Sequence, residues 1–185
     1  TIPLFEELHP VVKRHADTFD LPPDLIYAII QTESSFNPKA KSGMNAHGLM
    51  QVVPSTGGAE VYQKLDGKQG KPSRQQLIDP DTNVRIGTAY LRILMNHYFP
   101  KVENPEVRLN LTIAAYNMGP SRLVRLIRKK GAPRDMAAFH AMLQKHAPKE
   151  TRDYVRKVNK RRHTYIALLD TCLLYTSDAA DDLFR

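Results

Sequence analysis

The sequence predicts a single all-α domain built from about seven to eight helices. Apolar residues recur at helical spacing along most of the chain, whereas the alternation typical of β-strands never continues for more than a few residues. The 185 residues are enough for one domain with a hydrophobic core. The composition changes near residue 171, so we assign the domain to residues 1–170 and consider residues 171–185 separately.

Two helices are expected in the first 36 residues. The first follows Pro10 and directs Val12 inward. The second opens at "DLPPD", because proline and aspartate both suit the first turn of a helix, and it continues to about Ser35. Pro38 disfavours helical geometry in Asn37, so the helix is expected to end before these two residues.

The middle of the chain is expected to hold two helices and a long loop. Ser55 is placed to act as the N-cap of the first of these helices. Residues 66–81 are rich in Gly, Pro and Lys and therefore predict a surface loop. The second helix covers about residues 82–98, with Gly87 and Tyr90 on its apolar face.

Four more helices are expected in the C-terminal half. One covers about residues 106–117 and ends at "YNMGP", where Asn117 or Gly119 can adopt left-handed geometry. The next ends at Gly131, and "RDMAAFHAMLQKH" forms another. The last is "KETRDYVRKVNKRRHTYIALL", in which Thr151 is expected to act as the cap.

The composition narrows the classes of partner and cofactor. The formal net charge of +8 comes from 27 Lys and Arg against 19 Asp and Glu; it favours polyanionic partners but also fits a solvated basic surface. No helix-turn-helix, zinc-finger, RRM or KH signature is present, so we expect no nucleic-acid partner. The seven histidines lack metal-ligand spacing, Cys172 is the sole cysteine, and nucleotide-binding motifs are missing, so we expect no metal and no cofactor.

The end of the chain differs from the rest. The segment "CLLYTSDAADDLFR" holds the sole cysteine, three Asp and one Arg, and no cap or turn links it to the preceding residues. It resembles translated sequencing-adaptor read-through, so we interpret residues 171–185 as a non-native tail. The alternative is a genuine acidic C-terminal tail.

Glu33 is a carboxylate on the apolar face of the second expected helix. It follows Ile26, Ile29 and Ile30 at i+7, i+4 and i+3, and it lies in the last turn, where the helix dipole disfavours negative charge. Both effects favour the neutral acid, so we expect a raised pKa, as general-acid chemistry requires. The alternatives are a side chain rotated into solvent, or one bonded to a buried partner.

Four short motifs in this order carry a resemblance to a known family. They are "ESSFNP", which contains Glu33, then "GLMQ", "AYN" and "ETRDYV". Together they resemble the soluble-lytic (SLT) type of lytic transglycosylase over about residues 5–165. The resemblance implies a lysozyme-like fold of the goose-lysozyme type. It also implies cleavage of the β-1,4 bond between N-acetylmuramic acid and N-acetylglucosamine in peptidoglycan without water, leaving 1,6-anhydro ends, with Glu33 as the sole acid/base.

The resemblance also implies a set of substrate-binding residues in the first half of the chain. Ser42 resembles a serine that bonds the catalytic carboxyl or the N-acetyl group of the sugar, and its alternative is a simple turn residue. Gln51 is expected to line the groove, with loop-bracing as the alternative. Gly48 is expected to let a sugar ring approach the backbone, unless it only shapes a turn.

Three further substrate-binding residues are expected in the second half. Tyr116 and Asn117 resemble a pair that positions the substrate and orients Glu33, although Asn117 can also serve helix termination. Tyr154 is expected to bring its hydroxyl to the scissile sugar, with core packing as the alternative. Glu150 resembles the acid of the last motif, and we expect a structural role or a bond to Tyr116.

The resemblance implies a partner and a location as well. The partner is peptidoglycan, acted on by a monomer in the periplasm, and the parent is an outer-membrane lipoprotein whose N-terminal lipid anchor is absent from this chain. One rival function is a lysozyme-type hydrolase, which needs a second carboxylate; Asp79 and Asp81 are the nearest loop candidates. Another is a glycan-binding domain without catalysis.

Overall fold

The computed structural model of the protein confirms the all-α class. It describes the backbone of residues 2–182 and the side chains of residues 5–171. In this part of the chain the only β-type pairing is two isolated bridges around His47. The helices are α1 (Ile2–Phe19), α2 (Pro23–Ser34), α3 (Ala59–Lys64), α4 (Arg74–Leu77), α5 (Pro80–Ile93), α6 (Pro105–Met118), α7 (Ser121–Lys130), α8 (Met136–His146) and α9 (Lys149–Asp182), with π-helical turns η1 (Pro54–Gly58) and η2 (Leu94–Tyr98).

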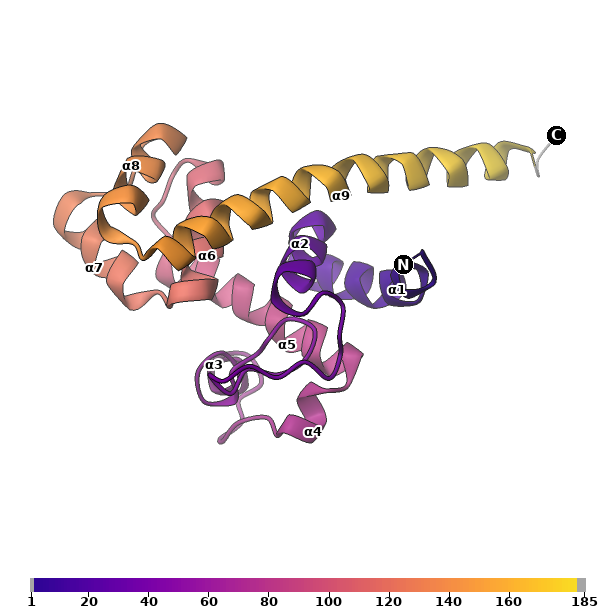
Figure 1. Ribbon diagram of the computed structural model, residues 1–185, viewed down its shortest axis with the longest axis horizontal. Helices are drawn as coiled ribbons and strands as arrows, with labels where there is room; N and C mark the ends of the chain where they lie inside the picture. Colours follow the sequence, from indigo (N-terminus) through magenta and orange to yellow (C-terminus); the bar gives the residue numbers. More distant parts are fainter. Residues whose placement is uncertain (1, 183–185) are drawn as a thin grey trace.

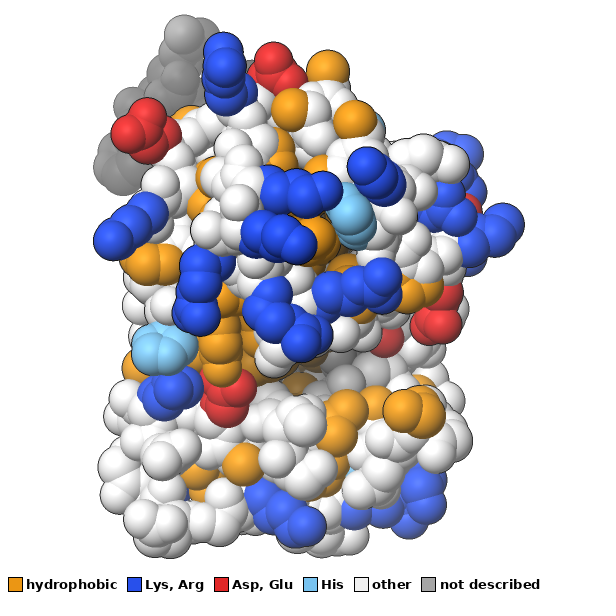
Figure 2. Space-filling model, turned by 90° about the vertical axis from the view of Figure 1, so that its left-hand side faces the viewer, with side chains coloured by type: hydrophobic (Ala, Val, Ile, Leu, Met, Phe, Trp, Pro, Cys, Tyr) orange, Lys and Arg blue, Asp and Glu red, His pale blue; other side chains and the backbone are white. Residues whose placement is uncertain are grey.

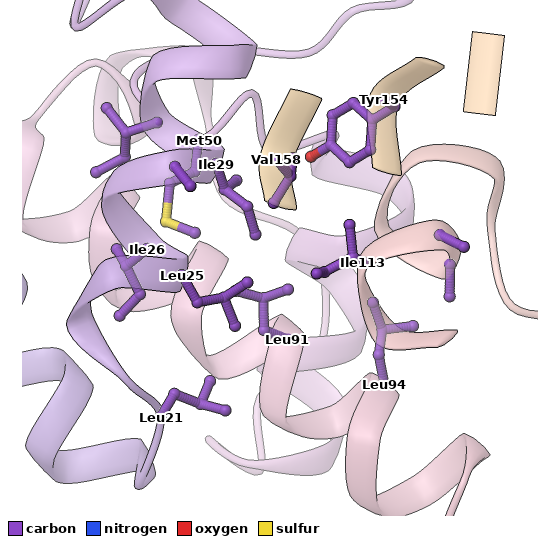
Figure 3. Close-up of a cluster of buried hydrophobic side chains, with 14 of the residues drawn as sticks. Leu21, Leu25, Ile26, Ile29, Met50, Leu91, Leu94, Ile113, Tyr154 and Val158 are labelled. Carbon is purple, nitrogen blue, oxygen red and sulfur yellow. The ribbon is translucent and has the colours of Figure 1, made fainter. Parts of the chain in front are cut away.

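Helix α2 forms the centre of the core. Its residues from Leu25 to Ile30 are all fully buried, as expected of a helix that is apolar on every side. Its most extensive packing is against α9, the long helix that crosses the top of the molecule in Figure 1. Figure 3 shows Ile29 of α2 facing Val158 and Tyr154 of α9, with Ile113 of α6 completing this layer.

The prediction that the first helix follows Pro10 is wrong, because α1 already begins at Ile2. The buried stripe of this helix is Leu8, Val12 and Ala16, so its first member precedes the proline. Pro10 removes a single backbone donor from the helix. Packing of the stripe against α5 outweighs that loss.

Two predictions for the middle of the chain are also wrong. The helical segment expected to start with a Ser55 cap begins at Pro54, in π geometry, with Val53 as N-cap. The expected loop over residues 66–81 contains α4, which explains why the structure has more helices than expected. Ser73 and Gln76 form a capping box around the first turn of α4, a local signal that the sequence displays as S-x-x-Q.

The C-terminal helices follow the prediction more closely. Helix α6 ends at Gly119, which has a φ of 81°, and α7 ends at Gly131, which has a φ of 83°. Thr151 is not a cap, since α9 begins at Lys149 and Thr151 lies buried in its first turn. The backbone of α9 continues to Asp182, whereas the side chains of the predicted non-native tail lie outside the described residues from Cys172 onward.

Hydropathy adds one observation about the helices. Within the described residues, no helix is both long enough and apolar enough to cross a bilayer.

Candidate active site

Glu33 lies in the last turn of α2, at a sharp change of chain direction. After Ser34 come Ser35 and Phe36, which both have left-handed backbone geometry, with φ values of 48° and 64°. Such geometry costs free energy in residues with side chains, and it ends the helix at Ser34, one residue after Glu33. The Ser35 amide bonds back to the Gln31 carbonyl to close the last turn.

The carboxyl group of Glu33 meets a single tyrosine from α9. The Tyr154 hydroxyl donates a hydrogen bond of 2.8 Å to Oε1 of Glu33. Burial raises the pKa of Glu33 from 4.5 to about 7; the Tyr154 bond works against the shift, and the negative charge of Glu150 adds to it. The expected increase is therefore confirmed, and one of its alternatives, a buried hydrogen-bond partner, holds at the same time.

The "GLMQ" loop is fastened beside α2 by a buried asparagine that the sequence analysis missed. Asn83 of α5 donates to the carbonyls of His47 and Leu77, at 2.8 and 2.7 Å, and accepts from the Met50 amide at 2.8 Å. Ser34, next to Glu33, donates to the Leu49 carbonyl at 2.7 Å. Asn83 lies four residues before Gly87, on the same apolar face of the predicted helix, so it is a polar residue within a buried stripe, like Glu33.

Gly48 is buried under Asn83 and does not offer its backbone to solvent. Its φ is 77°, and a Cβ at this position would overlap the Asn83 side chain and the Leu77 carbonyl. These observations favour the turn-shaping alternative. Gln51 also braces the loop, because its side-chain nitrogen donates to the carbonyls of Ala40 at 3.1 Å and Gly48 at 3.0 Å.

Ser42 occupies the turn on the other side of this loop. Its Oγ accepts from the backbone amides of Met44 and Ala46, both at 3.2 Å. Both bonds use the lone pairs of the oxygen, so the hydroxyl proton remains to be donated. Ser42 is therefore a turn residue in this structure and keeps one donor.

Tyr116 joins the "AYN" motif to the loop. Its hydroxyl donates to the Met50 carbonyl at 2.6 Å, so of the two roles expected for Glu150 the bond to Tyr116 is not formed. Burial raises the pKa of the Tyr116 hydroxyl, and the charge of Glu33 raises it further. Its ring packs at 5.8 Å from the ring of Tyr90 in α5, which extends the aromatic surface beside the loop.

Asn117 and Thr151 connect the end of α6 to the start of α9. The Thr151 hydroxyl donates to Oδ1 of Asn117 at 2.8 Å. This bond fixes α6 relative to the turn of α9 that carries Tyr154. Asn117 thus has a bracing role, and the left-handed residue that ends α6 is Gly119 instead.

The hydrogen bonds bring the four motifs together. Glu33 and Tyr154 bond directly, Tyr116 contacts the "GLMQ" loop, and Thr151 of "ETRDYV" contacts Asn117. The part of the chain that the structure describes has no group of three or more His, Cys, Asp or Glu side chains placed to hold a metal ion. These contacts assemble one carboxyl group with a raised pKa, which accepts a hydrogen bond from a tyrosine and lies next to a braced loop.

Comparison with protein families gives a match over residues 10–139 to the transglycosylase SLT domain. The chain belongs to the transglycosylase SLT family. The four motifs of the sequence and the lysozyme-like helical fold agree with this assignment.

Relatives and solved structures of the SLT family support the assignment. Membrane-bound lytic murein transglycosylase C of Serratia proteamaculans is 42% identical over 164 residues, which cover 84% of this chain and 46% of that protein. The lytic transglycosylase Slt of Pseudomonas aeruginosa, solved as an inactive mutant, superposes with a TM-score of 0.71 at 33% identity, over 88% of this chain and 24% of that one.

A second solved structure gives the same result. The 70 kDa soluble lytic transglycosylase of Escherichia coli superposes with a TM-score of 0.69 at 34% identity, covering 90% of this chain and 26% of that one. The SLT chain described here spans about half the length of the curated relatives it matches.

Proposed function

We propose that this chain is a peptidoglycan lytic transglycosylase that cleaves the β-1,4 bond between N-acetylmuramic acid and N-acetylglucosamine without water. Glu33 is its sole acid/base. The observation that carries the proposal is the Glu33 carboxyl, whose pKa burial raises to about 7, at 2.8 Å from the Tyr154 hydroxyl. The names of the relatives identified above support the same activity.

The proposed reaction uses Glu33 twice. The neutral acid donates its proton to the glycosidic oxygen while the bond from that oxygen to C1 of the muramoyl sugar breaks. The C6 hydroxyl of the same sugar then bonds to C1, and its proton passes to the Glu33 carboxylate. The acid is regenerated, and the product is a 1,6-anhydro end. A pKa of about 7 makes both protonation states accessible near neutral pH, which suits a group that must act first as acid and then as base.

The other site residues have supporting roles in this proposal. Tyr154 orients the Glu33 carboxyl through its hydrogen bond. Ser42 keeps a hydroxyl proton for the N-acetyl group of the sugar or for Glu33. Tyr116 and Asn117 hold the "GLMQ" loop and the start of α9 in place. Gln51 and Gly48 contribute by shaping the loop that borders the substrate.

A hydrolase of the lysozyme type would need a second carboxylate to activate water or to attack C1. The two candidates for this carboxylate, Asp79 and Asp81, are both bonded to other parts of the fold. Asp79 is the N-cap of α5 and accepts from the Thr82 amide at 2.9 Å. Asp81 bonds to Arg14 and to His15 of α1. Glu150 is a third candidate, because its negative charge raises the pKa of Glu33.

Mass spectrometry of the muropeptides released from purified sacculi tests the proposal. The wild-type protein should release products lighter by one water than hydrolysis predicts, and Glu33→Gln should release none. Glu150→Gln is the matched control and should still give anhydro products. Full-mass reducing ends that disappear in Glu150→Gln would instead identify a hydrolase with two carboxylates. Binding to sacculi without any release would indicate a glycan-binding domain.

The proposal extends to location and organisation. Because the relatives are named membrane-bound, we propose that the chain acts on the periplasmic side of the envelope and that its parent is anchored to the outer membrane as a lipoprotein. We also propose that it acts as a monomer. We further propose that residues 1–170 form the catalytic domain and that residues 171–185 take no part in it.

A further inference from the structure

Helix α7 carries an outward row of cations that the proposed reaction does not use. Its apolar side packs inward through Leu123, whereas its basic residues are all exposed. Two more exposed cations follow on the connection to α8 and on α8 itself. We call the set the basic face: Arg122, Arg125, Arg128, Lys129, Lys130, Arg134 and Lys145.

The charges of the basic face are not neutralised by the rest of the described chain. None of the ion pairs between described residues includes one of its cations. The nearby carboxylate of Asp135 instead caps α8 by accepting from the Ala138 amide at 2.8 Å. Desolvation and the positive charges of Lys130, Lys145 and Arg122 lower the pKa of His146, as expected where cations gather.

The basic face is broad, and three of its cations line a shallow groove. Figure 2 shows Lys and Arg side chains spread over the upper part of one side of the molecule, where α7 and α8 lie. Between the two helices lies a groove of about 510 Å³. Leu126, Ala138 and Met142 contribute to its apolar part. Its charged part consists of Lys130, Arg134 and Lys145 together with the one carboxylate of Asp135.

We propose that the basic face docks this domain on an anionic phospholipid surface. Clusters of four to eight basic residues on a helix attract anionic lipid head groups, and each contributes about 1 kcal/mol near the surface. The seven cations face outward from two helices and their connection, which suits a plane of phosphates better than a single bound anion. The apolar part of the groove beside Lys130, Arg134 and Lys145 suits the boundary between head groups and acyl chains.

Docking at this face would also fix the orientation of the active site. Helix α7 begins at Ser121, four residues after Asn117, whose side chain bonds to the first turn of α9. The basic face and the Glu33 site are therefore connected through the end of α6. A membrane bound at α7 and α8 would hold the site at a defined angle to the bilayer.

Binding to vesicles tests the inference without any catalysis. The full chain is sedimented with vesicles of phosphatidylglycerol and phosphatidylcholine, and with vesicles of phosphatidylcholine alone. The test variant is the triple Arg125→Gln, Arg128→Gln, Lys129→Gln. The matched control is Lys68→Gln, Lys71→Gln, Arg74→Gln, which removes three exposed cations from the loop around α4 and changes the net charge equally.

The wild-type chain should bind only the anionic vesicles, and more weakly as salt rises. Because each cation strengthens binding about fivefold, the basic-face triple should bind about a hundredfold more weakly. The control triple should bind the anionic vesicles only a few-fold more weakly than wild type. Both triple variants should unfold at the wild-type temperature. An equal loss in the two triples, or equal binding of wild type to neutral vesicles, would overturn the inference.

A parallel measurement distinguishes binding to phospholipid from binding to peptidoglycan, which is also a polyanion. The same two triples are made in the Glu33→Gln background and sedimented with purified sacculi, which carry peptide carboxylates. The inference expects both triples to bind sacculi alike. If the basic-face triple lost sacculus binding and kept vesicle binding, the face would instead recognise an acidic glycopeptide. Since neither assay measures cleavage, the inference can fail while the proposed reaction stands.

Discussion

At one end of the interface between α2 and α9, Asp24 accepts a hydrogen bond from Arg162, and at the other end Glu33 accepts one from Tyr154. Both carboxyl groups belong to α2, and both partners come from α9. The Asp24 pair is an ion pair at 2.9 Å, and little of either side chain is exposed. The Glu33 pair joins a carboxyl to a neutral phenol, and none of the ion pairs between described residues includes Glu33.

The difference shows how position along one helix selects the chemistry of a carboxyl group. Asp24 lies in the first turn of α2, where the helix dipole favours negative charge, and a guanidinium completes its environment. Glu33 lies in the last turn, where the dipole opposes negative charge, and burial raises its pKa to about 7. One end of the interface therefore stabilises the fold, and the other provides a proton near neutral pH.

The largest expected effect is the loss of activity in Glu33→Gln. General acid–base catalysis contributes about 10²–10⁴-fold, and the amide cannot transfer the proton. Activity on sacculi should therefore fall by at least this factor, while far-UV circular dichroism stays unchanged. Asp24→Asn is the control from the other end of α2. This variant should have a lower free energy of unfolding, but its folded molecules should cleave at the wild-type rate. Glu33→Gln with more than a tenth of wild-type activity would contradict the assignment.

Removing the cation at the Asp24 end should produce the next largest effect. Arg162→Met leaves a buried carboxylate without its partner, which typically costs about 3–5 kcal/mol in the free energy of unfolding. Urea denaturation at pH 7 measures the loss. Arg161→Met is the matched control. Among the described side chains the neighbouring Arg161 bonds only to the neutral Thr32 hydroxyl, at 2.9 Å, and about 1 kcal/mol or less is expected there. Equal losses in the two variants would show that the ion pair between Asp24 and Arg162 stabilises the fold no more than the bond between Arg161 and Thr32 does.

The stability of the wild-type protein should depend on pH in a way that Glu33→Gln removes. Between pH 4.5 and about 7 the folded state keeps the Glu33 proton that the unfolded state has lost, so the free energy of unfolding falls as pH rises. The full effect is at most about 3 kcal/mol. The two proteins should be equally stable at pH 4, and Glu33→Gln should be more stable at pH 8. Urea denaturation that shows no divergence between these pH values would rule out the raised pKa.

Tyr154→Phe should produce a smaller change in the pH dependence of activity. The Tyr154 bond favours the carboxylate form, so its loss raises the pKa of Glu33 further. The alkaline limb of kcat/KM should move to higher pH by about one unit or less. Tyr165→Phe is the control, since it removes a bond of 2.9 Å between α9 and Gln31 of α2 and should leave the limb in place. A limb that shifts equally in both variants would assign the effect to general loosening of the interface.

Much of the helical framework can be predicted from local sequence. The bounds of α2 and α6 agree with the prediction to about a residue, because proline, aspartate and glycine mark their ends. Helix α4 is not predicted although Ser73 and Gln76 form its capping box, because the glycine and proline residues around it are typical of a loop. Asn83 could have been found by the criterion that identified Glu33, a polar side chain within an apolar stripe.

The sequence by itself determined the all-α class, the motif order and the place of Glu33 on a buried helix face, because these depend on periodicity and on residues close in the chain. Only the tertiary structure decided which group meets each polar side chain. Tyr154 is 121 residues from Glu33, Arg162 is 138 from Asp24, and Thr151 is 34 from Asn117. Such partners are selected by the packing of α9 against α2 and α6, for which no local pattern exists.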